Sequence, residues 1–266
     1  MVVIIAFVAC AIFAPLIAPH APDSGSLGTR LIPPVWEHGG STEYLLGTDR
    51  LGRDILSRLI YGARISMLIS VGAILITGTI GSVVGVVAGY FGGWIDAVFM
   101  RMADVSLSLP SILIAILLAS LYGPSFTNVV VVVILSLWPS YARIIRGETL
   151  SLRSRDYVVL ARVAGVPTLR LMARHLLPNL LPSLLVISTL QVGIVILLEA
   201  SLSFLGAGIP SPTSSWGVMV SDGQSVIELA WWASVLPGLV IAVTVLSLNL
   251  GGDWLRDRLD PSLREI

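Results

Sequence analysis

Residues 141–183 of this chain read YARIIRGETLSLRSRDYVVLARVAGVPTLRLMARHLLPNLLPS, and this stretch decides the fold class. It carries seven Arg side chains against only two acids, Glu148 and Asp156. No charged residue occurs from Val105 to Ala142, or again from Leu176 to Leu198. An Arg-rich loop between apolar runs marks the cytoplasmic side of a membrane protein, because translocating those charges is disfavoured. The stretch therefore predicts a helical surface beneath a membrane domain, where another protein can bind.

The composition indicates an integral membrane protein built from helices. Of the 266 residues 55% are hydrophobic and only 12% are charged, with a mean hydropathy of +0.92. A soluble domain carries about 25% charged residues. Several uncharged runs approach or exceed the roughly 20 residues that cross the hydrocarbon core. No basic patch with interleaved aromatic residues indicates a nucleic acid partner.

Arginine usage limits the chemistry of the chain. All 16 cationic side chains are Arg, so the chain has no Lys. A phosphate-binding loop of the Walker type needs a Lys to reach the nucleotide phosphates. Any ATP hydrolysis must therefore come from a partner, and we expect no cofactor and no metal site in this chain. The single Cys10 lies in an apolar run, which excludes an intrachain disulfide and favours a buried side chain.

The apolar runs predict six transmembrane helices. The first, 1–18, is interpreted as a retained helix rather than a cleaved signal peptide, because it lacks a cationic start and leaves through a Pro-rich segment. The uncharged run 105–142 is too long for one span and is divided by turn residues at 122–125. The other spans are expected at 65–91, 182–205 and 233–250, the last ending at Gly251-Gly252.

The region between the first two spans is expected to lie outside the membrane. Residues 20–44 are rich in Pro, Gly and Ser, which indicates a loop. In 51–63, apolar residues recur at helical spacing while Arg53, Asp54 and Arg58 take the other face, which predicts a helix along the membrane surface. We therefore divide the chain into a first region 1–64, a core of five spans at 65–253 with a cytoplasmic loop at 143–182, and a tail 254–266.

Six spans place both termini on one side of the membrane. With the Arg-rich loop in the cytoplasm, both termini are expected to be cytoplasmic. The first loop, the turn at 122–125 and residues 210–232 then face outward. The first loop carries as many acids as Arg, but long translocated loops follow the charge rule less closely.

Small residues recur every four positions along the second expected span. Glycine in a helix interior costs about 1 kcal/mol relative to Ala, so we expect this stripe to admit a neighbouring helix at close range. The alternative is that small residues are simply common in membrane helices. The series consists of Ala73, Thr77, Gly81, Gly85, Gly89 and Gly93.

Local signals in the Arg-rich loop predict a short helix, a sharp turn and a second helix. Ser154 is expected to cap the first helix, and Asp156 suits its positive end. Gly165 is placed to end that helix. Thr168 is expected to cap the second helix, which ends or kinks at Pro178.

This loop resembles the EAA loop of ABC importer permeases, in which a Glu-Ala-Ala run is followed by a Gly four residues later and then by an Ile-x-Leu-Pro element. Ala161 matches the last Ala, Gly165 the glycine, and Leu177-Pro178 the closing pair. The departures from the usual Glu, first Ala and Ile are Val159, Leu160 and His175.

Further blocks extend the resemblance over nearly the whole chain, and together they are similar to the C-type permease subunit of dipeptide and oligopeptide importers. They are LGTDRLGRD at 46–54, RHLLPN at 174–179, EASLSFLG at 199–206, PTSSWG at 212–217 and GDWLRDRLDP at 252–261.

The resemblance implies a type I ABC importer permease fold in the bacterial cytoplasmic membrane. Such a chain is non-catalytic and forms half of the pathway with a homologous B-type permease. Two ATP-binding subunits hold ATP and Mg, and an extracytoplasmic substrate-binding protein delivers the substrate. Peptides are the expected cargo, although related permeases carry nickel, glutathione or larger ligands. The implied ATPase-coupling residues are Arg155, Asp156, Tyr157, Ala161, Arg162, Gly165, Leu177 and Pro178.

A few single residues carry hypotheses of their own. Glu199 interrupts an apolar run, and intramembrane carboxylates are functional candidates by default. We therefore treat it, with Ser203, Phe204 and Trp216, as a pathway or gate candidate. The alternative is that Glu199 pairs with a partner subunit or lies near the outer interface. We interpret His175 as a polar anchor at the membrane boundary rather than as a proton acceptor or a metal ligand.

Two other function classes fit the sequence less well. An intramembrane enzyme needs paired acids, a Ser/His pair or a His-Glu-x-x-His run, and none is present. A secondary transporter more often shows internal repeats, broken spans in matched halves and several buried charges. The sequence therefore predicts a transport subunit, surrounded by membrane lipid and driven by partner ATPases.

Overall fold

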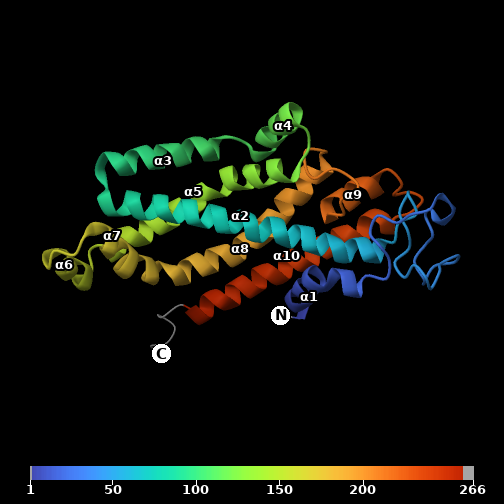
Figure 1. Ribbon diagram of the computed structural model, residues 1–266, viewed down its shortest axis with the longest axis horizontal. Helices are drawn as coiled ribbons and strands as arrows, with labels where there is room; N and C mark the ends of the chain where they lie inside the picture. The colour runs from blue at the N-terminus through green and yellow to red at the C-terminus, as the bar shows by residue number, and fades with distance from the viewer. Residues whose placement is uncertain (1, 260–266) are drawn as a thin grey trace. The chain divides into compact units, whose positions relative to one another are not determined.

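The computed structural model describes residues 2–259, and helices make up most of that range (Figure 1). The one β-type contact among these residues is an isolated bridge between Thr48 and Asp54. The all-α membrane fold predicted above is confirmed. In chain order the helices are α1 (Val2–Ile17), the 3-10 turn η1 (Leu27–Thr29), α2 (Ile55–Phe91), α3 (Gly93–Ser108), α4 (Ser111–Tyr122), α5 (Phe126–Leu152), α6 (Asp156–Val163), α7 (Thr168–Leu171), the π-helical turn η2 (Met172–Leu176), α8 (Leu177–Phe204), α9 (Trp216–Gln224) and α10 (Trp232–Leu259).

Four helices are long and apolar enough to cross a membrane: α2, α5, α10, and the continuous helix Thr168–Phe204 that contains α8. Helices α3 and α4 make a fifth span only when they are taken together, because a bend of 77° separates them. Helix α1 has 16 residues, fewer than the roughly 20 that cross hydrocarbon. Within the described residues the structure thus supports four to five spans, and the expected six require α1 as well.

The bend between α3 and α4 lies at Leu109-Pro110, which the sequence analysis did not identify as a break. The ring of a proline disfavours the helical region for the preceding residue. Leu109 accordingly adopts an extended backbone, with φ −91° and ψ 120°. The expected turn between 122 and 125 is present, and Gly123 there has a positive φ of 79°.

The chain forms two compact units, whose boundaries fall inside the long helices. Unit 1 comprises residues 1–72, 114–130 and 192–250, and unit 2 comprises 73–113, 131–191 and 251–266. This division differs from the expected one, which followed membrane topology. Helix α10 passes through Gly251-Gly252 without a break, so these glycines do not end it. Residues 260–266 of the expected tail lie outside the described residues.

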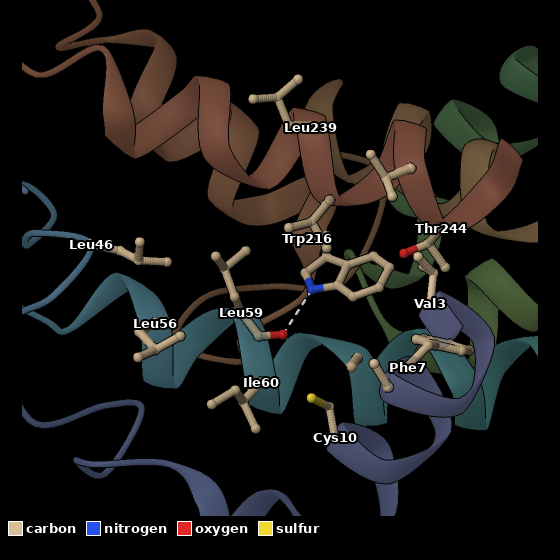
Figure 2. A pocket seen from close by; sticks show the side chains of 14 residues that line it. Val3, Phe7, Cys10, Leu46, Leu56, Leu59, Ile60, Trp216, Leu239 and Thr244 are labelled. Carbon is tan, nitrogen blue, oxygen red and sulfur yellow. Dashed lines mark hydrogen bonds between the residues drawn. The ribbon is translucent and has the colours of Figure 1, made fainter. Parts of the chain in front are cut away.

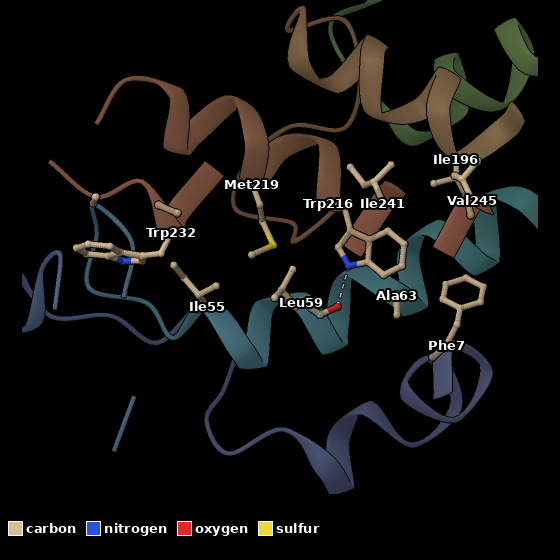
Figure 3. Packing of buried hydrophobic residues seen from close by; sticks show 13 residues of the cluster. Phe7, Ile55, Leu59, Ala63, Ile196, Trp216, Met219, Trp232, Ile241 and Val245 are labelled. Carbon is tan, nitrogen blue, oxygen red and sulfur yellow. Dashed lines mark hydrogen bonds between the residues drawn. The ribbon is translucent and has the colours of Figure 1, made fainter. Parts of the chain in front are cut away.

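The core of unit 1 is an apolar cluster around Trp216, on α9 (Figure 3). The indole packs against Phe7 of α1 with ring centroids 5.6 Å apart. Ile55 and Leu59 of α2 belong to the same cluster, as does Trp232 at the start of α10. Where these helices cross the membrane, the cluster is stabilised by van der Waals packing between side chains rather than by their removal from water. Residues 210–232, for which the sequence predicted only an outward-facing position, thus contain a helix that is part of this core.

The start of α2 differs from the expected surface helix at 51–63. Helix α2 runs for 37 residues from Ile55 to Phe91 without interruption, because nothing near residue 64 breaks the helical hydrogen bonding. The expected polar face is also not exposed. Arg53, Asp54 and Arg58 are only 1–3% exposed, since they pair with other groups of unit 1 rather than with water.

In unit 2, α2 and α5 approach closely along the glycine stripe. A Cβ atom on Gly85 would lie 2.7 Å from the Ala142 carbonyl oxygen, and one on Gly89 would lie 2.8 Å from Thr149 Cβ. Gly81 lies equally close to Tyr141. Gly93 is the exception and the expectation for it is wrong. It follows the end of α2, has a φ of 56° and has open space around it, so its role is to let the chain turn into α3.

Gly85→Ala should therefore destabilise the protein by about 1–3 kcal/mol, because overpacking moves the α5 backbone. Gly72→Ala is the matched control: it lies in the same helix, with no atom within 4 Å of the new methyl group. Alanine there should be neutral or stabilising by up to about 1 kcal/mol. Thermal unfolding of the two purified variants measures the difference, and equal stabilities would contradict the close α2–α5 contact.

Candidate functional site

Helix α6 is the centre of the candidate site, and its start is set by backbone geometry rather than by a side-chain cap. Arg155 occupies the N-cap position with an extended backbone, and its side chain forms no capping hydrogen bond. The expected cap, Ser154, instead donates a hydrogen bond from its hydroxyl to the Ser151 carbonyl, 2.9 Å away. Asp156 in the first turn and Arg162 in the last both suit the helix dipole.

The end of α6 is a Schellman motif built on Gly165. The Val166 amide donates to the Ala161 carbonyl, and the Gly165 amide donates to the Arg162 carbonyl, each at 3.1 Å. The motif needs a left-handed residue, and Gly165 supplies a φ of 76°. The chain then re-enters a helix at Thr168, which is the first residue of α7, while Pro167 holds the cap position. The cap was expected at Thr168, but it lies one residue earlier, at Pro167.

One face of α6 anchors it to unit 2. Val158 is fully buried and Ala161 is half-buried. They join an apolar cluster with Ile145 and Leu152 of α5 and with Leu171 of α7. Because this cluster includes side chains from several helices of unit 2, a displacement of α6 is transmitted to them through packed atoms.

The other face of α6 and the adjoining α7 expose apolar side chains. Leu160 is 66% exposed, Val163 81% and Leu169 80%. Tyr157 and Val159 are also exposed, though less. A short helix that is apolar on more than one side cannot bury all of its faces against its own chain, and such a surface marks an interaction site. The sequence analysis named Tyr157 but missed Leu160, Val163 and Leu169; the run Tyr-Val-Val-Leu at 157–160 was the available signal.

Two arginines tie the α6 region to the end of α2. The Arg153 guanidinium donates to the Gly89 and Tyr90 carbonyl oxygens at 2.9 and 3.3 Å, which satisfies the last turn of α2. The guanidinium of Arg162 lies 5.2 Å from the centre of the Tyr90 ring, within reach of a cation–π contact. Arg162, proposed from the resemblance as a coupling residue, is therefore also a positioning residue for α6. Arg153 was not singled out from the sequence.

The remaining coupling candidates, Leu177 and Pro178, lie on the far side of the π-helical turn η2. The helix does not end at Pro178: α8 contains both Pro178 and Pro182. A proline ring clashes with the carbonyl four residues before it, and the wider π-helical turn just before Leu177 relieves that constraint. The His175 carbonyl in this turn accepts a hydrogen bond from the Asn179 side-chain amide at 2.7 Å.

The expected pathway residues all lie in unit 1, and they differ in how far they are exposed. Glu199 is 1% exposed, and Ser203 donates a hydrogen bond to its Oε1 at 2.8 Å. The Glu199 Oε2 atom is buried without a partner among the described residues. Phe204 is 39% exposed. A pathway between two subunits needs residues at the surface of each chain, and in this structure only Phe204 meets that condition.

Trp216 is a core residue rather than a gate. Its side chain is 2% exposed, and its Nε1 donates to the Leu59 carbonyl at 2.9 Å. The indole lines an apolar cavity of about 400 Å³, and Figure 2 shows Phe7 of α1 beside it, with Cys10 of the same helix also on the cavity wall. With 2% of its surface exposed, Trp216 offers almost no surface to a pathway between subunits, so the structure does not support that assignment.

A buried charge cluster also lies in unit 1 and was missed from the sequence. The Asp49 carboxylate accepts hydrogen bonds from Arg53 and from Arg58. Asp222 of α9 pairs with Arg53 at 3.3 Å and with the more exposed Arg50 at 2.9 Å. The cluster joins the loop before α2 to α9, so its role in the chain is to hold these two segments together.

Comparison with known proteins now places the chain. Residues 81–265 match the family model described as a binding-protein-dependent transport system inner membrane component. The chain belongs to this family. Residues 1–34 also match a model described as the N-terminal TM domain of oligopeptide transport permease C. The matched range includes α6 and Gly165. The predicted membership in the inner-membrane permease family is confirmed.

Relatives of this permease cover most of its length. It is 44% identical to a di/tripeptide transport system permease protein DppC of Pseudomonas aeruginosa, over 96% of this chain and 84% of the relative. It is 44% identical to the dipeptide transport system permease protein DppC of Escherichia coli, over 99% and 87%. A chain of the inward-facing MetNI methionine ABC transporter superposes with a TM-score of 0.64 at 16% identity, covering 76% of this chain and 96% of that one. The last likeness supports the permease fold alone.

Proposed function

We propose that this permease forms half of the transmembrane pathway of an ABC importer for di- or oligopeptides. Its 44% identical relatives are named as permeases of dipeptide and di/tripeptide transport systems. A homologous B-type permease supplies the other half of the pathway, and an extracytoplasmic binding protein delivers the peptide. The chain has no Lys for a Walker loop, so ATP and Mg are bound by two partner ATPase subunits.

The coupling part of this proposal rests on one observation about α6. One of its faces is exposed and apolar, while the opposite face is packed firmly into unit 2. Leu160 and Val163 need a partner to cover them, while Val158 holds the opposite face in the core of unit 2. A cleft on an ATPase subunit that takes up α6 buries this surface. Closure of the ATPases then moves α6 and the helices packed against it as one body.

The proposal also fixes the orientation of the chain. An ATPase is cytoplasmic, so α6 and both termini lie in the cytoplasm and the loop between α1 and α2 faces outward. Labelling of a cysteine introduced at Val163, with the native Cys10 replaced by alanine and in cells that lack the ATPase subunits, tests this directly, with a thiol reagent that does not cross the membrane. We expect labelling only after the membrane is opened, and labelling of intact cells would contradict the orientation.

Val163→Asp tests the docking surface. A carboxylate placed in an apolar interface costs about 1–3 kcal/mol or more, so the ATPases should bind about tenfold more weakly and peptide uptake should fall in step. Leu27→Asp is the control, since Leu27 is similarly exposed, at 76%, but lies in the loop after α1. Co-purification of the ATPases with each tagged variant measures binding. Undiminished ATPase binding by Val163→Asp would contradict docking on α6.

Substrate class needs a separate measurement. In the reconstituted complex, we expect the binding protein loaded with a dipeptide to stimulate ATP hydrolysis, and nickel ions with the same binding protein to leave it at the basal rate. Stimulation by nickel instead would remove the peptide assignment but leave the docking of α6 intact. The isolated permease should hydrolyse no ATP at all.

A further inference from the structure

A groove in unit 2 runs between α2, α3 and α5, away from the α6 surface. It encloses about 540 Å³, a volume typical of sites for small molecules. Figure 1 shows α3 folding back along α2 from the turn that joins them. The groove is lined by apolar side chains and by only two polar residues, Arg101 and Ser106; among the apolar ones are Phe99, Met102, Val105 and Trp138.

Most of the polar atoms in the groove are already satisfied within the protein. The Ser106 hydroxyl donates to the Leu135 carbonyl at 2.8 Å and accepts from the Trp138 indole at 3.1 Å. These bonds fix the indole on the groove wall. A ligand in the groove therefore contacts apolar side chains and one charged group, the guanidinium of Arg101.

Arg101 carries a charge that the described part of the chain does not neutralise. Its two acidic neighbours on α3 are each taken by an arginine of α5: Asp104 by Arg143 at 2.5 Å, and Asp96 by Arg146 in a bidentate pair. Arg101 forms no salt bridge with any described residue and is exposed. The groove thus has a single uncompensated positive charge, which is complementary to one anionic group.

The outer face of α3 indicates that the groove opens toward lipid. Trp94 is 76% exposed, Val98 48%, Met102 53% and Val105 55%. These residues follow one another at helical spacing and form an apolar ridge beside the groove. In a membrane protein such a ridge contacts acyl chains.

We propose that this groove binds an anionic phospholipid, with its phosphate on Arg101 and an acyl chain along the apolar floor. The planar guanidinium can donate two parallel hydrogen bonds to a phosphate. Basic pockets between membrane helices are known to bind anionic headgroups. A zwitterionic lipid offers the same phosphate but brings its own cation, so it leaves Arg101 less well compensated. The proposal needs only that the chain is embedded in a membrane, and it is independent of the cargo.

Native mass spectrometry of the detergent-purified transporter complex, titrated with phosphatidylglycerol or phosphatidylcholine, tests the site. Removing one cation near a lipid headgroup should weaken binding about fivefold. We therefore expect Arg101→Gln to lose that factor for phosphatidylglycerol and Arg101→Lys to keep most of the affinity. Arg170→Gln, an exposed arginine of α7 outside the groove, should bind like the unmodified complex. Val105→Trp should also reduce binding, because it fills the groove while leaving Arg101 in place.

Three results would overturn the proposal. The first is wild-type phosphatidylglycerol affinity in both Arg101→Gln and Val105→Trp. The second is equal affinity of the unmodified complex for phosphatidylcholine and phosphatidylglycerol. The third is efficient cross-linking of a cysteine at Val105 to the second permease in membranes, which would show that a protein covers the groove.

Discussion

Replacing Gly165 with valine should abolish peptide uptake while leaving membrane insertion intact. Gly165 has a φ of 76°, which a β-branched residue adopts only at a cost of about 1–3 kcal/mol. The chain relieves that strain by opening the Schellman motif, and the angle between α6 and α7 changes. Since α6 is expected to transmit the movement of the ATPases, a small change in its angle should uncouple ATP hydrolysis from uptake. Uptake of a labelled dipeptide and the amount of inserted permease are measured on the same membranes.

Two control variants separate backbone conformation from side-chain volume. Nothing lies within 4 Å of a Cβ added at Gly165, so steric crowding cannot account for the loss. Asn tolerates the left-handed region, and Gly165→Asn should therefore retain most uptake. Gly147 of α5 has equally open surroundings and no positive φ, so Gly147→Ala should transport normally. Uptake by Gly165→Val at the level of Gly147→Ala would show that the turn is not needed.

Much of the candidate site around α6 could be predicted from the sequence because its signals are local. The residues of α6 predict a short helix, and Gly165 predicts its end within a dozen positions. The structure has both features. The close approach at Gly81, Gly85 and Gly89 also follows from spacing along a single helix. Signals of this kind depend on backbone preferences, which act over a few residues and do not need the tertiary structure.

The rest depends on which distant segments meet, and a single sequence does not contain that information. In the sequence Arg53 and Arg58 look like part of a solvated helix face. In the structure they are buried and form ion pairs with Asp49 and Asp222. Trp216 was predicted to be a pathway or gate residue, yet α1 and α2 enclose it. The continuation of α2 across residue 64 and of α10 across Gly251-Gly252 has the same origin, because neighbouring helices stabilise stretches whose local signals are weak.

Asp49→Ala should be the most destabilising single change in unit 1, because it leaves two buried cations without their main partner. Arg53 and Arg58 are 4% and 1% exposed, and Asp49 itself is 7% exposed. The same carboxylate also accepts from the Leu51 and Arg53 amides at 2.8 and 3.0 Å. Removing one member of a buried ion pair costs about 3–5 kcal/mol. We expect a large fall in the thermal unfolding temperature of the purified protein and faster proteolysis between α1 and α2.

The exposed member of the same cluster provides the matched control. Arg50 is 43% exposed and pairs with Asp222 at 2.9 Å, and an ion pair of that exposure contributes only about 0–1 kcal/mol. Arg50→Ala should therefore leave the unfolding temperature nearly unchanged. Removing charge on both sides, in Asp49→Asn with Arg58→Gln, should restore part of the stability lost in Asp49→Ala, since fewer cations then remain unpaired. If Asp49→Ala and Arg50→Ala unfold at the same temperature, the cluster is solvated and does not hold α9 to the start of α2.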